Sequence, residues 1–120
     1  MIFLRVTGII TEYNPLHRGH VHLLEEVRRL LGEDTAVVCA MSGDFVQRGD
    51  LAVLRRQSRA AAAVRSGADL VLELPLPWAA APAERFADGG VQVLLGTGVA
   101  DILAFGSECG DGAALRRLAA

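Results

Sequence analysis

Four short apolar runs, each followed by a segment with helical spacing, constrain the fold of this chain more than any other feature. The runs cover residues 3–11, 35–41, 69–74 and 101–105. Segments with apolar residues three or four positions apart follow them, at 18–31, 55–66, 82–95 and 111–120. Near-continuous apolar strands that alternate with helices are typical of parallel sheets covered on both faces. The pattern therefore predicts an α/β fold, a Rossmann-like, doubly wound parallel sheet.

Composition excludes several kinds of active site and binding surface. The 120 residues suffice for one compact domain with a core. All 12 cationic residues are arginine, which excludes a lysine nucleophile or a phosphate-loop lysine. The net charge of −2 gives the chain no overall nucleic-acid-binding character.

Cysteine spacing and hydropathy indicate where the protein works. Cys39 and Cys109 lack a CxxC spacing or a matching histidine pair, so we expect ordinary buried thiols and no metal site. The N-terminal apolar run is too short for a membrane span and is interrupted by Arg5. No leader peptide is visible either. We therefore expect a cytoplasmic protein that does not enter a membrane.

The turn after the first apolar run carries the residues best suited to bind a nucleotide phosphate. His17 and His20 lie one helical turn apart, so both imidazoles fall on one face at the start of the predicted helix. The positive helix end and free backbone N–H groups favour an anion there. Gly19 lets a nucleotide approach the backbone, and Asn14-Pro15 redirects the strand into the helix. In open parallel sheets, ligands bind at this carboxyl end of the strands.

Two histidines alone leave other interpretations open. They would also suit a solvent-exposed helix start, and a zinc site is less favoured because no third ligand lies at a suitable spacing. His22 falls on another helix face, and we interpret it as peripheral. The order of strand, Asn-Pro turn, HxGH and helix favours phosphate binding.

Five sequence blocks carry a more specific resemblance. They are GIITEYNPLHRGH at 8–20, MSGDFVQRG at 41–49, GADLVLELP at 67–75, AERFADGG at 83–90 and FGSE at 105–108. In this order, and over nearly the whole chain, they resemble the N-terminal part of the bacterial tRNA(Met) cytidine acetate ligases. Those enzymes belong to the HxGH nucleotidyltransferase superfamily.

The resemblance implies a two-step reaction. ATP and acetate give acetyl-adenylate and pyrophosphate, and the acetyl group then passes to N4 of the wobble cytidine of elongator tRNA(Met). His17 and His20 would be catalytic by stabilising charge on the departing pyrophosphate, with the nearby phosphate keeping them protonated. ATP, with Mg, is the implied cosubstrate; regions outside this chain would make most of the tRNA contacts. The implied nucleotide-binding residues are Ile10, Thr11, Glu12, Tyr13, Asn14, Pro15, Leu16, His17, Arg18, Gly19, His20, Val21, His22, Leu23 and Gly106.

The loop after the second apolar run is a second candidate site. Ser42, Gly43, Gln47 and Arg48 would form a substrate loop on the same edge of the sheet, with Gln47 and Arg48 holding a carboxylate or phosphate. The alternative is an exposed loop with one solvated arginine.

A basic stripe marks the helix predicted at 55–66. Arg55, Arg56, Arg59 and Arg65 would contact a tRNA backbone or form a solvated face, and the sequence favours neither.

Three further side chains lie near the edge of the third predicted strand. Glu73 and Glu84 would suit acid–base chemistry, but acetate arrives ionised and needs no base. We therefore interpret Glu73 as structural or as a pocket contact. Trp78 would stack on a base or pack within its loop, and packing is favoured.

Departures from the family pattern limit what the resemblance implies. Leu16, Arg18 and Leu51 replace residues that are common in the family. Residues 107–120 contain nothing like its second phosphate-binding motif, Ser-x-x-x-x-Arg. We therefore expect residues 1–120 to be an ATP-binding nucleotidyltransferase-like domain cut before that motif and before the tRNA-binding region. A non-catalytic nucleotide-binding remnant of the same fold, or another HxGH adenylyltransferase, remains an alternative.

Overall fold

The four apolar runs form one parallel sheet. A computed structural model of the protein, which describes residues 5–106, places the strands in the order β3-β2-β1-β4 with every neighbouring pair parallel. The strands are β1 Val6–Thr11, β2 Ala36–Ser42, β3 Leu70–Leu74 and β4 Ile102–Leu103. The predicted α/β fold is confirmed.

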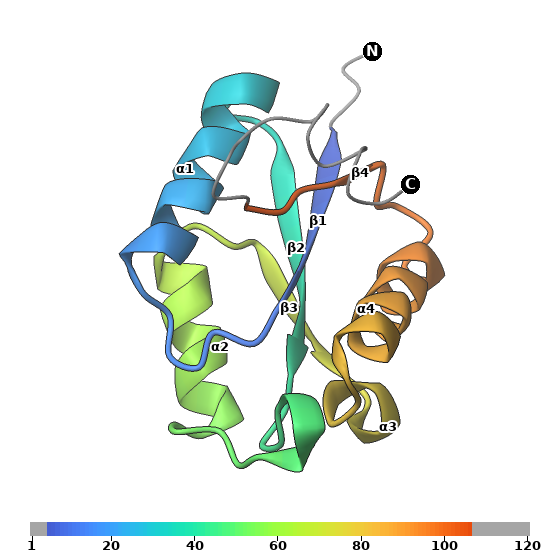
Figure 1. Ribbon diagram of the computed structural model, residues 1–120. Coiled ribbons are helices and arrows are strands. Elements are labelled where there is room, and N and C mark those ends of the chain that lie inside the picture. Colours follow the sequence, from blue (N-terminus) through green and yellow to red (C-terminus); the bar gives the residue numbers. More distant parts are fainter. Residues whose placement is uncertain (1–4, 107–120) are drawn as a thin grey trace.

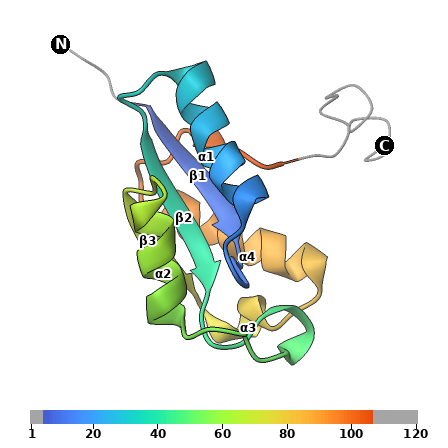
Figure 2. The ribbon, with the colours of Figure 1, turned by 90° about the vertical axis from the view of Figure 1, so that its left-hand side faces the viewer.

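Helices cover both faces of this sheet (Figure 1). α1 and α2 lie on one face, α3 and α4 lie on the other, and Figure 2 shows α1 and α2 in front of the strands. The helices are α1 Arg18–Leu31, α2 Arg56–Arg65, α3 Leu76–Ala79 and α4 Ala83–Gly96, with a short 3-10 helix, η1, at Gln47–Gly49. The change of face after β3 is what makes the sheet doubly wound.

The strand order places the switch point of the topology at β1. From β1 the chain moves outward through β2 to β3, and it then returns to pair β4 with the free side of β1. Gly8 of β1 is consequently opposite Val38 on one side and Leu103 on the other. Ligands of open α/β sheets bind at such a point, outside the carboxyl ends of the strands. The end of β1 is where the predicted histidine turn begins.

Alternate side chains of β2 enter two cores. Val37 and Cys39 pack with Leu24 and Val27 of α1, whereas Val38 and Ala40 pack with α4. Cys39 is fully buried, as the sequence predicts, and Cys109 lies outside the described residues. No helix in residues 5–106 is long and apolar enough to cross a membrane.

Two adjacent glycines let α4 approach the sheet closely. A β-carbon added at Gly89 would lie 2.3–2.6 Å from atoms of Trp78, and one added at Gly90 would lie 2.5–2.8 Å from the side chain of Ile10. The helix predicted at 82–95 therefore forms in spite of its glycines. Gly89 and Gly90 are the positions at which it packs against Trp78 and Ile10. Trp78 packs against α4, as expected, but from a short helix.

Several predicted bounds differ from the structure. The first strand begins at Val6, and the last one spans two residues instead of 101–105. Next to β4, the backbone N–H of Asp101 donates to the Val6 carbonyl at 2.9 Å, and a side-chain oxygen of Asp101 accepts the Val6 N–H at 3.1 Å. The helix α3 and the 3-10 helix η1 are not predicted from the sequence. The helix expected at 111–120 lies outside the described residues.

Candidate functional site

The chain leaves β1 through a turn that is anchored in the core. Tyr13 has a φ of 45°, in the left-handed region that non-glycine residues rarely occupy, and its side chain is buried. Its hydroxyl lies 3.6 Å from Sγ of Cys39, and burial raises its pKa far above the ordinary value, so the hydroxyl stays protonated. The Tyr13 ring meets His20 edge-on, with 4.9 Å between centroids. The buried Tyr13 ring thus supports one side of the His20 ring.

His17 and His20 cap α1 with their own side chains. Nδ1 of His17 accepts the backbone N–H of Gly19, and Nδ1 of His20 accepts that of His17, both at 3.1 Å. The two rings stack at 3.7 Å between centroids. Because each Nδ1 is an acceptor, the proton of each neutral ring is on Nε2. The predicted pairing of the imidazoles on one face is confirmed, and both rings present an Nε2–H donor.

The cap changes the expected electrostatics of the turn. The backbone N–H of Gly19 donates to Nδ1 of His17, and that of His20 donates to the His17 carbonyl, so these two N–H groups are not free as expected. Burial first, and then the charge of His17, lowers the pKa of His20. The surroundings of His20 therefore favour its neutral imidazole, which donates from Nε2.

Two residues of the turn hold the neighbouring loop through their side chains. Oε2 of Glu12 accepts the backbone N–H of Gln47 at 2.7 Å, and Oδ1 of Asn14 accepts that of Val53 at 2.7 Å. Both were predicted among the nucleotide-binding residues. In the structure these oxygens join the histidine turn to the loop that follows β2.

The other residues predicted to line ATP divide into packed and exposed groups. Ile10, Leu16 and Leu23 pack against the cores, and Thr11 is buried. The exposed members are Pro15, His17, Arg18, Gly19, His22 and Gly106. Gly106 lies three residues beyond β4, and a β-carbon there would contact nothing within 4 Å.

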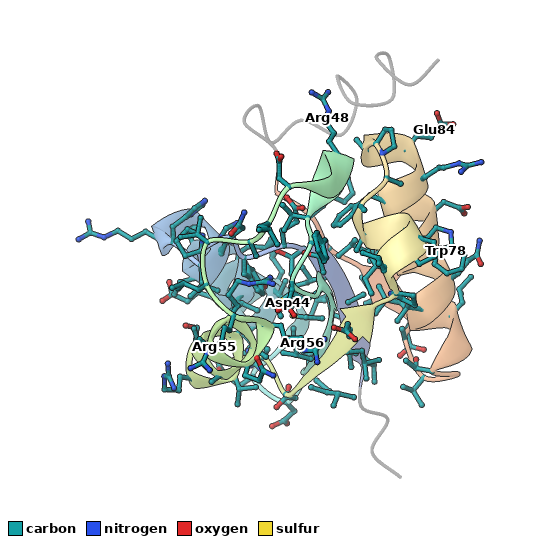
Figure 3. The ribbon with its side chains drawn as sticks, turned by 90° about the horizontal axis from the view of Figure 1, so that it is seen from below. Asp44, Arg48, Arg55, Arg56, Trp78 and Glu84 are labelled. Atoms are coloured by element: carbon teal, nitrogen blue, oxygen red, sulfur yellow. The ribbon has the colours of Figure 1, made fainter. Side chains whose placement is uncertain are left out.

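The predicted substrate loop begins at the buried end of β2 and reaches an exposed tip. Ser42 is fully buried, and its Oγ has no hydrogen-bond partner within residues 5–106. Gln47 begins η1, directly beside Glu12. Figure 3 shows Arg48 at the tip of η1, pointing away from the sheet, and its φ is 65°. The structure thus joins Gln47 to the histidine turn and leaves Arg48 at the surface.

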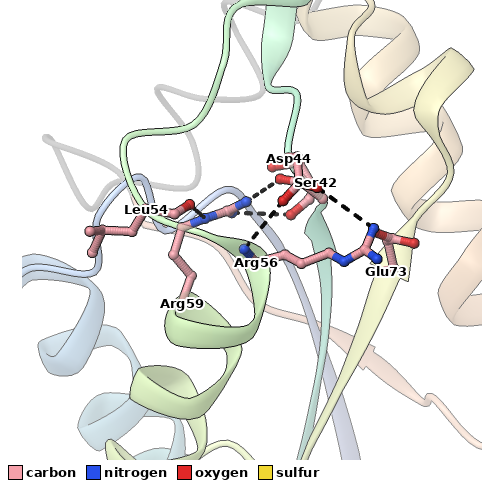
Figure 4. A network of polar contacts seen from close by, with 7 residues as sticks. Ser42, Asp44, Leu54, Arg56, Arg59 and Glu73 are labelled. Atoms are coloured by element: carbon pink, nitrogen blue, oxygen red, sulfur yellow. Dashed lines mark hydrogen bonds and ion pairs between the residues drawn. The ribbon is translucent and has the colours of Figure 1, made fainter.

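Arg59 corrects the interpretation of the basic stripe. Its side chain is 1% exposed, so it belongs neither to a solvated face nor to a tRNA contact. Its guanidinium donates to the carbonyls of Glu12 (2.6 Å), Ser42 (3.1 Å), Leu54 (3.0 Å) and Gly43 (Figure 4). The spacing to Ala63, a buried residue four positions later on the same helix face, was the signal that could have revealed it.

Arg56 is engaged in a surface ion pair. Its guanidinium lies 2.9 Å from Oε1 of Glu73 and 3.9 Å from Oδ2 of Asp44 (Figure 4). Glu73 thus makes a structural ion pair and also lines two hollows, so both interpretations given for it remain open. Hollows of about 270 and 220 Å³ share this ion pair as part of their lining. Arg55, Arg65 and Glu84 are exposed, which is compatible with a solvated face and with a tRNA contact alike.

Comparisons with known proteins extend this picture. The model of the HIGH Nucleotidyl Transferase family matches residues 4–120. The tRNA(Met) cytidine acetate ligase of Acetivibrio thermocellus is 50% identical over 108 residues, which are 90% of this chain and 26% of that protein. That of Syntrophotalea carbinolica is 52% identical over 116 residues, which are 97% of this chain and 27% of that protein.

A solved structure agrees with the fold as well. The crystal structure of Thermotoga maritima TmcAL bound with alpha-thio ATP is 44% identical, with a TM-score of 0.88 over 97% of this chain and 28% of that chain. The chain therefore spans little more than a quarter of the length of the relatives it matches. Because the family model covers nearly all of the sequence, this chain belongs to the HIGH nucleotidyl transferase family.

Proposed function

We propose that this chain is the ATP-binding, acetate-activating part of a tRNA(Met) cytidine acetate ligase. The reaction would convert ATP and acetate into acetyl-adenylate and pyrophosphate, and the acetyl group would then pass to N4 of the wobble cytidine of elongator tRNA(Met). Relatives named for this activity at 50% and 52% identity support the proposal. So does the bound alpha-thio ATP in the related crystal structure.

The histidine pair is the observation that carries the proposal. A carboxylate oxygen of acetate would attack the α-phosphorus, and the bond to the bridging oxygen would break as pyrophosphate leaves with the electron pair. Negative charge then grows on the pyrophosphate oxygens. His17 and His20 would each donate Nε2–H to these oxygens from positions fixed by the cap, so little reorganisation is needed at the moment of reaction.

Other groups have supporting roles in this proposal. Acetate is already ionised at neutral pH, so attack needs no general base. Mg²⁺ would enter with ATP on its phosphate oxygens, as is usual for this ion. Exposed residues such as Arg48 and Arg55 are available to a tRNA, but with a net charge of −2 we expect this chain alone to bind tRNA weakly.

Acetate-dependent exchange of labelled pyrophosphate into ATP tests the proposal in the complete protein. We expect His17→Ala and His20→Ala each to lower exchange by about 10²-fold or more, the range for loss of a preorganised donor. Glu25→Ala, an exposed change on the same helix, is the control and should leave exchange unchanged. Full exchange in both histidine variants would refute the mechanism. ATP binding without acetate-dependent exchange in the wild type would favour a non-catalytic nucleotide-binding domain.

A further inference from the structure

A buried arginine joins the two segments that meet at the carboxyl edge of the sheet. Arg59, on α2, donates its hydrogen bonds to backbone carbonyls of four residues. One of these residues, Glu12, belongs to the turn that leads to the histidine pair. The other three, Ser42, Gly43 and Leu54, stand at the two ends of the loop that contains η1.

The Arg59 guanidinium binds both ends of the loop and one carbonyl of the turn. Nη1 of Arg59 donates to Glu12 and to Ser42, so a single nitrogen bridges the ends of β1 and β2. Nε holds Leu54, where the loop returns to α2. The side-chain bonds from Glu12 to Gln47 and from Asn14 to Val53 connect the same two segments farther out. No other side chain in residues 5–106 makes hydrogen bonds to both ends of this loop and to the turn.

Arginine has the chemistry that this position requires. Its planar guanidinium carries five donors in fixed directions, whereas lysine offers one compact ammonium group. Burial lowers the pKa of the Arg59 guanidinium, and the nearby carboxylates of Asp44 and Glu12 act in the opposite direction. Because arginine keeps its proton in proteins, the carbonyls face a charged donor.

We propose that Arg59 is a positioning residue that couples loop 43–54 to the histidine turn. When nucleotide binds at His17 and His20, the loop that carries Gln47 and Arg48 is ordered through Arg59. The coupling rests on the proposed function, because it assumes that ATP binds at the histidine pair. Arg59 itself touches neither ATP nor acetate in this arrangement.

Hydrogen–deuterium exchange on the complete protein, with and without ATP, tests the coupling. In the wild type, we expect ATP to slow exchange in residues 12–21 and also in residues 43–54. In Arg59→Lys, ATP should still protect the turn, but protection of the loop should be lost. Arg65→Lys is the matched control because Arg65 is exposed on the same helix, and it should behave as the wild type. Loop protection that persists in Arg59→Lys would overturn the proposal, and so would its absence in the wild type when ATP is bound.

A ligand-free comparison separates this proposal from the proposed function. Without ATP, Arg59→Lys should speed exchange in both segments, by roughly tenfold for each lost hydrogen bond to the guanidinium, while β1 and β2 keep wild-type rates. If the wild type binds no ATP, the proposed function fails, and this comparison still decides whether Arg59 couples the segments. Arg59→Gln, whose neutral amide keeps two N–H donors, replaces the lysine variant if circular dichroism shows that the latter is unfolded.

Kinetics distinguish positioning from simple support of the fold. A positioning role predicts that Arg59→Lys raises the KM for acetate while the dissociation constant of ATP stays within about threefold. A purely structural role would lower the amount of active enzyme and leave the KM unchanged, and that outcome would contradict the proposal. Active-site titration provides the required correction for folded enzyme.

Discussion

Gly89→Ala would place a methyl group where α3 and α4 touch. The added β-carbon would lie 2.4 Å from Cβ, 2.3 Å from Cγ and 2.6 Å from Cδ1 of Trp78. Cβ of Trp78 is bonded directly to the backbone of α3, so no change of rotamer can move it away. The two helices must therefore separate, and the contact that holds α4 beside the sheet is weakened.

Two opposing effects decide the magnitude. Alanine is more favourable than glycine in a helix interior by about 1 kcal/mol. Overpacking of a well-packed core destabilises by about 1–3 kcal/mol, and the fixed obstacle here favours the upper part of that range. We expect Gly89→Ala to lower the free energy of unfolding by about 1–2 kcal/mol. Gly90→Ala should lower it less, because the atoms it meets belong to the Ile10 side chain beyond Cβ.

Urea unfolding followed by far-ultraviolet circular dichroism measures these differences. Gly96→Ala is the control: it makes the same change at the end of the same helix, where a β-carbon meets nothing within 4 Å. It should leave stability unchanged or raise it by up to about 1 kcal/mol. If Gly89→Ala were as stable as the wild type, or if Gly96→Ala lost as much, the close-approach explanation of these glycines would be refuted.

Two further predictions concern the histidine turn. Tyr13→Phe should lower the free energy of unfolding by about 1 kcal/mol, by removing a buried hydroxyl contact with Cys39, and should leave ATP affinity within about twofold because the ring still meets His20; calorimetry checks both, and a large loss of affinity would contradict it. His20→Asn keeps an acceptor for the His17 N–H but cannot titrate. Because the folded-state pKa of His20 is lowered, wild-type stability should fall relative to His20→Asn as pH decreases through about 6.5 and on through the folded-state pKa, and equal slopes in urea titrations would disprove this.

The parts of the fold that follow local patterns were predictable from the sequence. Apolar runs and helical spacing identified the strands and the three long helices, because each pattern reflects burial along one element. The short helix α3 was missed because Pro75 was interpreted only as the end of the third strand. Proline is compatible with a helix start, however, and Pro75 is the N-cap there.

The site was predictable where its chemistry is local. The spacing of His17 and His20 placed both rings on one face, and the structure shows them stacked. The burial of Arg59 was not predicted, since a run of arginines on an alanine-rich helix usually indicates a solvated face. Its partners lie up to 47 positions away, and so do not appear in any local pattern.

The contacts between the blocks explain why these sequence segments work as a unit. Residues 8–20 and 41–49 are separate in sequence, but Glu12 and Gln47 join them, and Arg59 binds carbonyls from both. The Glu12 side chain and the carbonyls of Glu12 and Ser42 therefore bind other parts of the protein. It follows that a loss of ATP affinity in Glu12→Gln or Asn14→Ala is not by itself evidence of a nucleotide contact. Such a loss indicates a direct contact only if exchange in residues 43–54 stays at the wild-type rate, because otherwise a released loop accounts for it.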